Sequence, residues 1–506
     1  MQRKGIFPLF LLLLWSAAPA ASQPNPAKPL DCTQMIGWLA GGVSSSRLTR
    51  LAQKYGIGFA ADESALRAME TAGADVGLLK ALAAVPVVAT SHGLACPEEL
   101  TRASAFVHQD HYDKAEPILR TLIAKDPQNP ALHFALGYVR QQQEDWDEAF
   151  DEYSESKELQ PGFPETHSRL ALNFYHSGDG DNAIAEARTA LSIDFRNAEA
   201  YRYLGLGLFA NVQYRAALHA FEESLARDPG SADAYYDIGI TQRTLGNAQA
   251  AVNAYRQAVH LNAAFWKAYN NLGIVLHDQG NWNEAVAAYQ QAKNLAPDEP
   301  SIRNNLGNTY CDKGDYDSAI AEFRELFRMS AEWGKGHGCL AKALMAKQDY
   351  VAALPELRLA VGENPTGSAE HRVLGQALLL LHQQQDAVRE LRRAVELDPD
   401  SSLAHHFLGT AFFQTSQWEA AAREFKLALH LEPSAGNHYS LAACLISLGR
   451  YNDALTELES AISLQPDQEL YRSRKEELLR LLGAINSPTR TASSGPRGQV
   501  SHGLRK

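Results

Sequence analysis

Two neighbouring stretches of the sequence decide the fold. Residues Tyr269–Pro297 read YNNLGIVLHDQGNWNEAVAAYQQAKNLAP, and residues Arg303–Ala331 read RNNLGNTYCDKGDYDSAIAEFRELFRMSA. Each stretch has apolar residues at helical spacing on both sides of a polar turn that contains glycine, which predicts two short amphipathic helices. Because the second stretch returns 34 residues after the first, we expect an array of such helix pairs.

The repeat extends over most of the chain. An alanine returns every 34 residues, or once after 33, at Ala115, Ala149, Ala183, Ala217, Ala251, Ala285, Ala319, Ala353, Ala387, Ala421 and Ala454. Twelve residues later a proline recurs at Pro127, Pro161, Pro229, Pro297, Pro365, Pro399, Pro433 and Pro466. A glycine recurs between them at Gly137, Gly205, Gly239, Gly273, Gly307, Gly375 and Gly409. Small residues let two helices cross closely, and proline ends the second helix.

With these positions the chain resembles the tetratricopeptide repeat family, whose unit is a 34-residue helix-turn-helix. The resemblance covers eleven units, residues 96–468. It implies an all-α fold, a right-handed α-solenoid of helix pairs that folds by stacking. Large residues four positions after the alanine are expected to fill the seam to the next unit; they are Tyr153, Phe221, Tyr255, Tyr289, Phe323 and Phe425.

One unit departs from the pattern. Residues Gly334–Gly338 read GKGHG at the start of its first helix, and Pro355 lies inside its second helix. Each glycine in a helix costs about 0.5–1 kcal/mol relative to alanine. This unit is therefore expected to be the least stable part of the array, although its neighbours could equally hold it rigid.

The ends of the chain predict other segments. Residues 1–22 have Arg3 and Lys4 before a short apolar run and small residues at a cut site, which indicates a cleaved signal peptide. A Pro-rich linker at 23–30 and a small helical module at 31–95 follow, the latter similar to modules that precede repeat arrays in other bacterial envelope proteins. After the repeats we expect a capping helix at 469–485 and a disordered tail at 486–506.

These segments predict a location. Without a second membrane-spanning stretch or a lipoprotein site before Cys32, the mature protein is expected to be periplasmic or secreted. An oxidising compartment allows disulfides, and Cys32 and Cys96 could form one, although two free thiols are an equal alternative. Cys311 and Cys339 have no cysteine nearby in sequence, so neither a zinc ribbon nor a thioredoxin-like site is expected.

Composition and motifs argue against several functions. The net charge of −12 is spread along the chain, with no clustered basic face for nucleic acid. The sequence has no phosphate-binding loop, nucleophile elbow or H-E-x-x-H motif, and its flanking segments are too short for a catalytic domain. We therefore expect a protein that is not an enzyme and that binds no cofactor and no metal.

Histidines recur at one repeat position, namely His133, His167, His337, His371, His405 and His438. Tyr201, Tyr235 and Tyr269 occupy this position in other units, and the family often has an aromatic residue there. The histidines also lack the neighbouring carboxylates that metal-binding imidazoles usually have. We expect them to pack between helices rather than to bind metal.

The first helices are expected to form a concave groove, where the family usually holds its ligands. Its candidate residues are Phe134, Tyr138, Tyr175, Phe209, Tyr236, Asn270, Asn271, Asn304, Asn305, Asn308, Lys342 and Arg372. Asparagine amides suit a peptide backbone, and aromatic rings provide rigid apolar contacts. Asn271 and Asn305 also resemble the asparagine ladder that grips peptides in O-linked N-acetylglucosamine transferases, although the asparagines could equally cap and solvate helices.

The resulting hypothesis is an exported adaptor that binds a protein or peptide of the cell envelope through this groove, and no nucleic acid. A cell-wall polysaccharide or other glycan is an alternative ligand, since aromatics and asparagine also suit sugars. A third possibility is an auxiliary subunit of an envelope synthase or secretion complex, which would have no activity alone.

Overall fold

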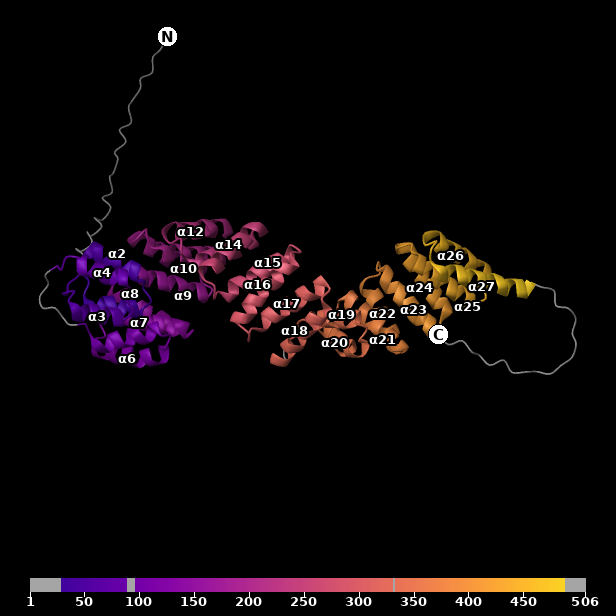
Figure 1. Cartoon of the computed structure of the whole chain (residues 1–506), viewed down its shortest axis with the longest axis horizontal. Helices are drawn as coiled ribbons and strands as arrows, with labels where there is room; N and C mark the ends of the chain where they lie inside the picture. Colours follow the sequence, from indigo (N-terminus) through magenta and orange to yellow (C-terminus); the bar gives the residue numbers. More distant parts are fainter. Residues whose placement is uncertain (1–28, 89–95, 331–332, 487–506) are drawn as a thin grey trace, which may run out of the picture. The chain divides into compact units, whose positions relative to one another are not determined.

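The computed structural model describes residues 29–88, 96–330 and 333–486 (Figure 1). The predicted signal peptide, most of the linker and the predicted C-terminal tail therefore lie outside the described residues, except that Asn486 ends the last helix. The chain divides into two compact units, Met1–Leu261 and Asn262–Lys506, which are described separately. Within the described residues 27 helices form, and the extended backbone is limited to isolated bridges that join Leu30 to Ile57 and Ile57 to Val87.

The N-terminal module contains four short helices: α1 (Cys32–Ala40), α2 (Ser45–Tyr55), α3 (Glu63–Thr71) and α4 (Val76–Ala84). Side chains of Asp31, Ser44, Asp62 and Asp75 cap their N-termini, each accepting a hydrogen bond from a backbone N–H three residues later. Cys32 and Cys96 form a disulfide with their Cα atoms 5.3 Å apart. The structure thus decides a pairing that the sequence left open, and it ties the module to the start of the repeats.

Ten repeat helices follow in the first unit. They are α5 (Glu98–His108), α6 (Tyr112–Lys125), α7 (Pro130–Gln142), α8 (Trp146–Leu159), α9 (Pro164–His176), α10 (Gly180–Ile193), α11 (Ala198–Ala210), α12 (Tyr214–Arg227), α13 (Ala232–Thr244) and α14 (Ala248–Leu261). Odd-numbered helices pack against the even-numbered helix that follows, as α7 does against α8 in Figure 1. Each pair then packs on the next pair of the unit.

The second unit contains twelve repeat helices and a last, longer helix. They are α15 (Trp266–Asp278), α16 (Trp282–Leu295), α17 (Pro300–Lys313), α18 (Tyr316–Met329), α19 (His337–Ala346), α20 (Tyr350–Glu363), α21 (Ser368–Leu380), α22 (Gln384–Leu397), α23 (Ser402–Gln414), α24 (Trp418–Leu431), α25 (Ala435–Ser447), α26 (Tyr451–Leu464) and α27 (Glu469–Asn486). Helix α27 packs on α26, where Tyr471 and Leu478 are buried. The predicted all-α fold of eleven helix pairs is confirmed.

The recurrent glycines lie against large side chains of their own unit. A Cβ on Gly137 would come within 2.8 Å of the Tyr153 ring, and one on Gly273 within 2.7 Å of the Tyr289 ring. Both rings are fully buried. The rings therefore fill the crossing of the two helices within one repeat. The sequence analysis had instead predicted that they fill the seam to the next repeat. Any larger residue than glycine would have to displace the ring.

Candidate functional site

The N-terminal module covers the start of the expected groove. Phe134 is fully buried, and its ring centroid lies 5.6 Å from Tyr153 and 5.4 Å from Phe163. A Cβ on Gly41, directly after α1, would collide with the Phe134 ring, so this turn lies on the ring itself. The prediction that Phe134 contacts a partner is therefore wrong, because a segment of the same chain already occupies its surface.

Tyr138 is likewise engaged, on one side by Gly42 of the module and on the other by Arg169. The guanidinium of Arg169 lies 5.2 Å from the Tyr138 ring centroid and donates a hydrogen bond of 3.3 Å to the Tyr203 hydroxyl. Arg169 is buried, and Glu199 lies 3.7 Å from it. Burial raises the pKa of Tyr138 above its ordinary value. Arg169 thus joins the first helices of three successive repeats.

A second arginine, which is half-buried, continues this network. Arg202 on α11 donates to Asp237 on α13 at 2.6 Å and lies 3.4 Å from Asp233. Burial raises the pKa of Tyr175, and the negative charge of Asp237 adds to the effect. Sequence reasoning missed these charged residues. The signal that could have found them was an arginine on one first helix, followed about one repeat later by an aspartate on the next first helix.

Phe209 and Tyr236 are half-buried, as Tyr175 is. The Phe209 ring centroid lies 5.1 Å from that of Tyr214, and the Tyr236 centroid lies 5.9 Å from that of Tyr255. Each ring packs on the second helix of its own repeat and keeps part of its surface exposed. These aromatic side chains are available for apolar contact, in contrast to Phe134.

The predicted asparagines come together in the second unit. Asn305 on α17 donates from Nδ2 to Asn270 Oδ1 on α15 over 3.1 Å, and Asn271 also has interaction partners. The amide oxygens of Asn304 and Asn308 are buried without a hydrogen-bond partner among the described residues. A buried unpaired acceptor costs about 1–3 kcal/mol unless a donor reaches it. We define Asn270, Asn304, Asn305 and Asn308 as the asparagine cluster.

Lys342 and Arg372 lie further along the same unit. Lys342 is exposed, 3.5 Å from Asp312. Burial acts to lower its pKa, but the nearby Cys311 and Asp312 outweigh this effect and raise it. Arg372 is half-buried on α21. Cys311, although distant from Cys339 in sequence, lies beside it, and its Sγ is 3.5 Å from the Cys339 carbonyl oxygen.

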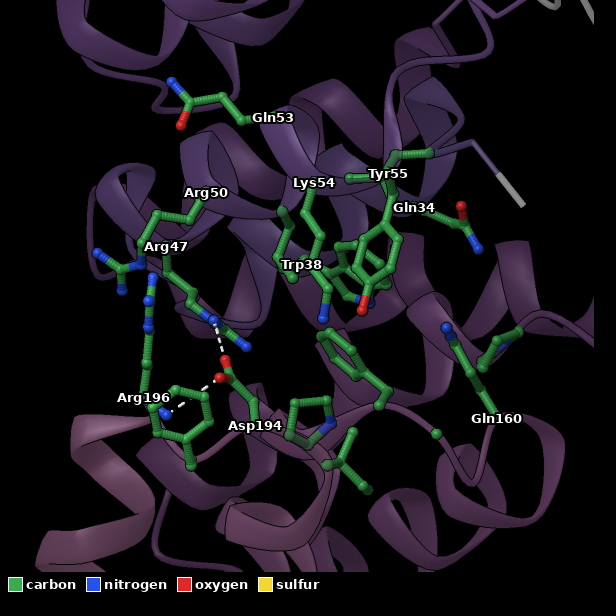
Figure 2. Close-up of a pocket in the computed structure, with 18 of the residues that line it drawn as sticks. Gln34, Trp38, Arg47, Arg50, Gln53, Lys54, Tyr55, Gln160, Asp194 and Arg196 are labelled. Carbon is green, nitrogen blue, oxygen red and sulfur yellow. Dashed lines mark hydrogen bonds and ion pairs between the residues drawn. The ribbon is translucent and has the colours of Figure 1, made fainter. Parts of the chain in front are cut away.

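A cavity of about 1120 Å³ lies between the N-terminal module and the early repeats, and we call it the module–array cavity (Figure 2). On the module side it is lined by Leu30, Gln34, Trp38, Arg47, Arg50, Leu51, Gln53, Lys54 and Tyr55. On the repeat side it is lined by Pro130, Leu159, Gln160, Gly162, Phe163, Pro164, Ser192, Ile193, Asp194, Phe195 and Arg196. Sequence reasoning missed this site, because it joins segments that lie far apart in the chain.

A buried ion-pair cluster holds the cavity together. Arg47 on α2 pairs with both Glu165 on α9 and Asp194 after α10. Burial raises the pKa of Glu165, whereas the charge of Arg47 acts in the opposite direction. For Asp194, burial would raise the pKa, but the backbone N–H of Arg196 and the charge of Arg47 hold it below its ordinary value. The module is thereby fixed to the repeat of α9 and α10.

The recurrent histidines have a structural role in described repeats of both units. Nδ1 of each lies 2.6–2.8 Å from a glutamate nineteen residues later, the pairs being His133–Glu152, His167–Glu186, His337–Glu356, His371–Glu390, His405–Glu424 and His438–Glu457. In four of them Nε2 also meets the carbonyl of the proline that ends the preceding repeat, namely Pro127, Pro161, Pro365 or Pro399. The expectation that they lack carboxylate neighbours is wrong, since the partner glutamate lies on the opposite helix of the pair.

Residues 29–88, 96–330 and 333–486 contain no helix with the length and apolar character needed to cross a bilayer. The same residues contain no group of three or more His, Cys, Asp or Glu side chains placed to hold a metal ion.

Comparisons with protein families give repeat matches along the chain. Models described as "Tetratricopeptide repeat" match residues 267–332 and residues 100–164, 204–251 and 304–368. A model described as "Anaphase-promoting complex, cyclosome, subunit 3" matches residues 381–461. The chain is also 34 % identical over 79 residues to the small glutamine-rich tetratricopeptide repeat-containing protein 2 of Mycosarcoma maydis. That match covers 16 % of this chain and 22 % of the relative.

Solved structures include similar chains with low superposition scores. A crystal structure of MamA is 27 % identical and has a TM-score of 0.28, covering 32 % of this chain and 94 % of MamA. A crystal structure of YrrB, described as a TPR protein with an unusual peptide-binding site, is 21 % identical with a TM-score of 0.32. It covers 39 % of this chain and 97 % of YrrB.

Proposed function

Since the chain is a tetratricopeptide repeat protein, we propose that it acts without chemistry of its own, as a scaffold that binds an extended peptide segment of a partner protein at the asparagine cluster. The observation that carries this proposal is the pair of buried, unpartnered amide oxygens of Asn304 and Asn308. Backbone N–H groups of an extended peptide are donors of the right kind for both oxygens.

The surroundings of the cluster support a peptide ligand. Asn305 and Asn270 are held in place by their own hydrogen bond of 3.1 Å, so the amides on α15 and α17 are ordered before a ligand arrives. A preformed row of amides suits main-chain recognition.

Selection from a random peptide library on the full chain tests this proposal. Peptides that are selected would be measured by calorimetry against wild type, Asn304→Ala/Asn308→Ala, and the control Asn294→Ala. Asn294 is exposed on α16 of the same unit. We expect at least tenfold weaker binding for the double variant and unchanged binding for the control. Equal affinities of all three proteins would refute the site, and binding of purified wall polysaccharide without any peptide binding would favour a glycan ligand.

We further propose that the protein is exported, to the periplasm or beyond, and that its partner is a component of the cell envelope. The Cys32–Cys96 disulfide supports this proposal, since structural disulfides persist in oxidising compartments. Fractionation of cells that express the full chain, followed by N-terminal sequencing of the product, tests it. A cytoplasmic protein that keeps residues 1–22 would contradict export.

A further inference from the structure

The module–array cavity carries an excess of positive charge. Arg50 and Lys54 on α2 and Arg196 before α11 reach it as exposed side chains, and none forms an ion pair with a described residue. Among the described lining residues the carboxylate is Asp194, which Arg47 and the backbone N–H of Arg196 already engage. Figure 2 shows Arg50 and Lys54 on the module side facing Asp194 and Arg196 on the repeat side. Because the whole chain has a net charge of −12, this local excess is a property of the site.

Three residues that line the cavity also have buried polar atoms without a hydrogen-bond partner in the described part of the chain. Nε1 of Trp38 and Nη2 of Arg47 are buried donors without a partner among the described residues, and Gln160 Oε1 is an acceptor in the same condition. Trp38 is 2 % exposed and Arg47 is 9 % exposed, so solvent does not replace the missing partners. Native proteins leave few such groups unpaired, and those that remain often mark a site for a ligand or an ordered water.

The cavity has an apolar side as well. The rings of Trp38 and Phe163 stack with their centroids 4.2 Å apart, which joins the module to the repeats. Phe195 is 62 % exposed, although it is a large apolar residue. Tyr55 is half-buried, and Lys54 lies 4.8 Å above its ring. A volume of about 1120 Å³ is large enough for a small organic molecule.

We propose that the module–array cavity binds a small organic acid, with the oxyanion held by Arg50, Lys54 and Arg196 and an apolar body packed against Phe163 and Phe195. The cations neutralise the oxyanion, and a guanidinium presents paired donors that suit a carboxylate or a phosphate. A ligand in this position contacts both the module and the repeats. Since the asparagine cluster lies in the other compact unit, this site stands independently of the proposed peptide binding.

Calorimetry with defined probes tests the proposal on the full chain. The probe is 1-naphthoate, with neutral 1-naphthamide as its uncharged analogue and 1-naphthyl phosphate as the second oxyanion. We expect wild type to bind naphthoate at submillimolar concentration and the amide at least tenfold more weakly. Tighter binding of the phosphate than of the carboxylate would identify the phosphate as the favoured oxyanion.

Variants separate the site from a general charge effect. Arg50→Gln/Lys54→Gln/Arg196→Gln is expected to bind naphthoate at least tenfold more weakly. Lys80→Gln/Arg102→Gln/Arg188→Gln removes the same charge from exposed positions of the same unit and should bind as wild type does. Circular dichroism would establish that both variants are folded. Absence of binding to wild type, equal binding of the amide, or equal loss in the two variants would each overturn the proposal.

Discussion

At the scale of single residues, the turn inside each repeat requires an unusual backbone conformation. One residue of every turn has a positive φ, which is a glycine at Gly178, Gly246, Gly280, Gly314 and Gly449. In the other repeats the residue is Asp110, Glu144, Val212, Gln348, His382 or Ser416. Residues with a Cβ are strained in this region, and β-branched residues most of all. The turn geometry is thus set by the helix pair, even where the residue opposes it.

Val212 offers the clearest test of this strain. It has a φ of 62° and is 67 % exposed, so its side chain contributes little packing. Val212→Gly is expected to stabilise the protein by about 1 kcal/mol, because glycine adopts this conformation without a clash. Val351→Gly is the matched control, since Val351 is exposed within helix α20 and the same change should destabilise there. In thermal unfolding, Val212→Gly should raise the melting temperature and Val351→Gly should lower it. A lower melting temperature for Val212→Gly would contradict the prediction.

His133 makes the stability of its repeat pH-dependent. Burial acts to lower its pKa, but hydrogen bonds to Glu152 and to the Pro127 carbonyl, with the charges of Glu152 and Glu155, outweigh burial and raise it. Protonation therefore stabilises the folded state; the contribution is complete below the unfolded value of about 6.5 and is lost as the pH rises through the raised pKa. His133→Gln should lower stability more at pH 5.5 than at pH 8.5. Urea unfolding at pH 5.5 and pH 8.5 would measure the free energy of unfolding of wild type and variant. Glu152→Gln should reduce the pH dependence of this free energy.

At the scale of elements, the repeat of α19 and α20 differs from its neighbours. Helix α19 has 10 residues, whereas α17 and α21 have 14 and 13. Its N-cap is Gly336 at a φ of 105°, which provides no side-chain hydrogen bond to the first turn. Pro355 lies inside α20, where it removes a backbone hydrogen-bond donor. Local weaknesses of this kind lower the free energy of local opening.

Hydrogen exchange tests whether this repeat opens first. Amides of α19 and α20 are expected to exchange about tenfold faster than those of α17 and α18, which corresponds to about 1.4 kcal/mol. Gly338→Ala should slow the exchange, since a Cβ there meets only Ala360 at 3.9 Å. Gly336→Ala should accelerate it, because its Cβ would come within 2.8 Å of Phe323. Exchange as slow as in the neighbouring repeats would contradict the prediction.

At the scale of the whole molecule, the largest departure from a plain repeat array is the docked N-terminal module. Gly37 allows α1 to approach α7 closely, since a Cβ there would lie 2.8 Å from Ala131 Cβ. The disulfide, the Trp38–Phe163 stack and the Arg47 ion pairs then hold the module on the first repeats. The module therefore closes one part of the expected groove and creates the module–array cavity.

Arg47 is expected to be essential for this docking. Arg47→Met should destabilise the protein by about 3 kcal/mol or more, because the buried carboxylate of Glu165 would lose its partner and half-buried Asp194 would lose its ion pair. Arg67→Met is the control, since Arg67 pairs with Glu63 on the exposed surface. It should lower the free energy of unfolding by less than about 1 kcal/mol. Chemical unfolding would compare the two variants. Equal small effects would show that the cluster does not hold the module.

The candidate site could be predicted from the sequence only in part. The register identified Asn270 and Asn305 as residues of neighbouring first helices, and the structure joins them by a hydrogen bond. The same register placed Phe134 in the groove, where the module in fact buries it. Register assigns a residue to a face of its helix, but it carries no information on what a distant segment places upon that face.

By itself, the sequence determined the repeat frame: the helix pairs, their order and the glycines at their crossings. This was possible because each repeat packs mainly on its neighbours, so the contacts that define it lie within about two repeat lengths. The tertiary structure alone decided the pairing of Cys32 with Cys96, the burial of Phe134 and the ion pairs of Arg47 with Glu165 and Asp194. These contacts join segments up to 147 residues apart, and they depend on how the module docks, which no local periodicity encodes.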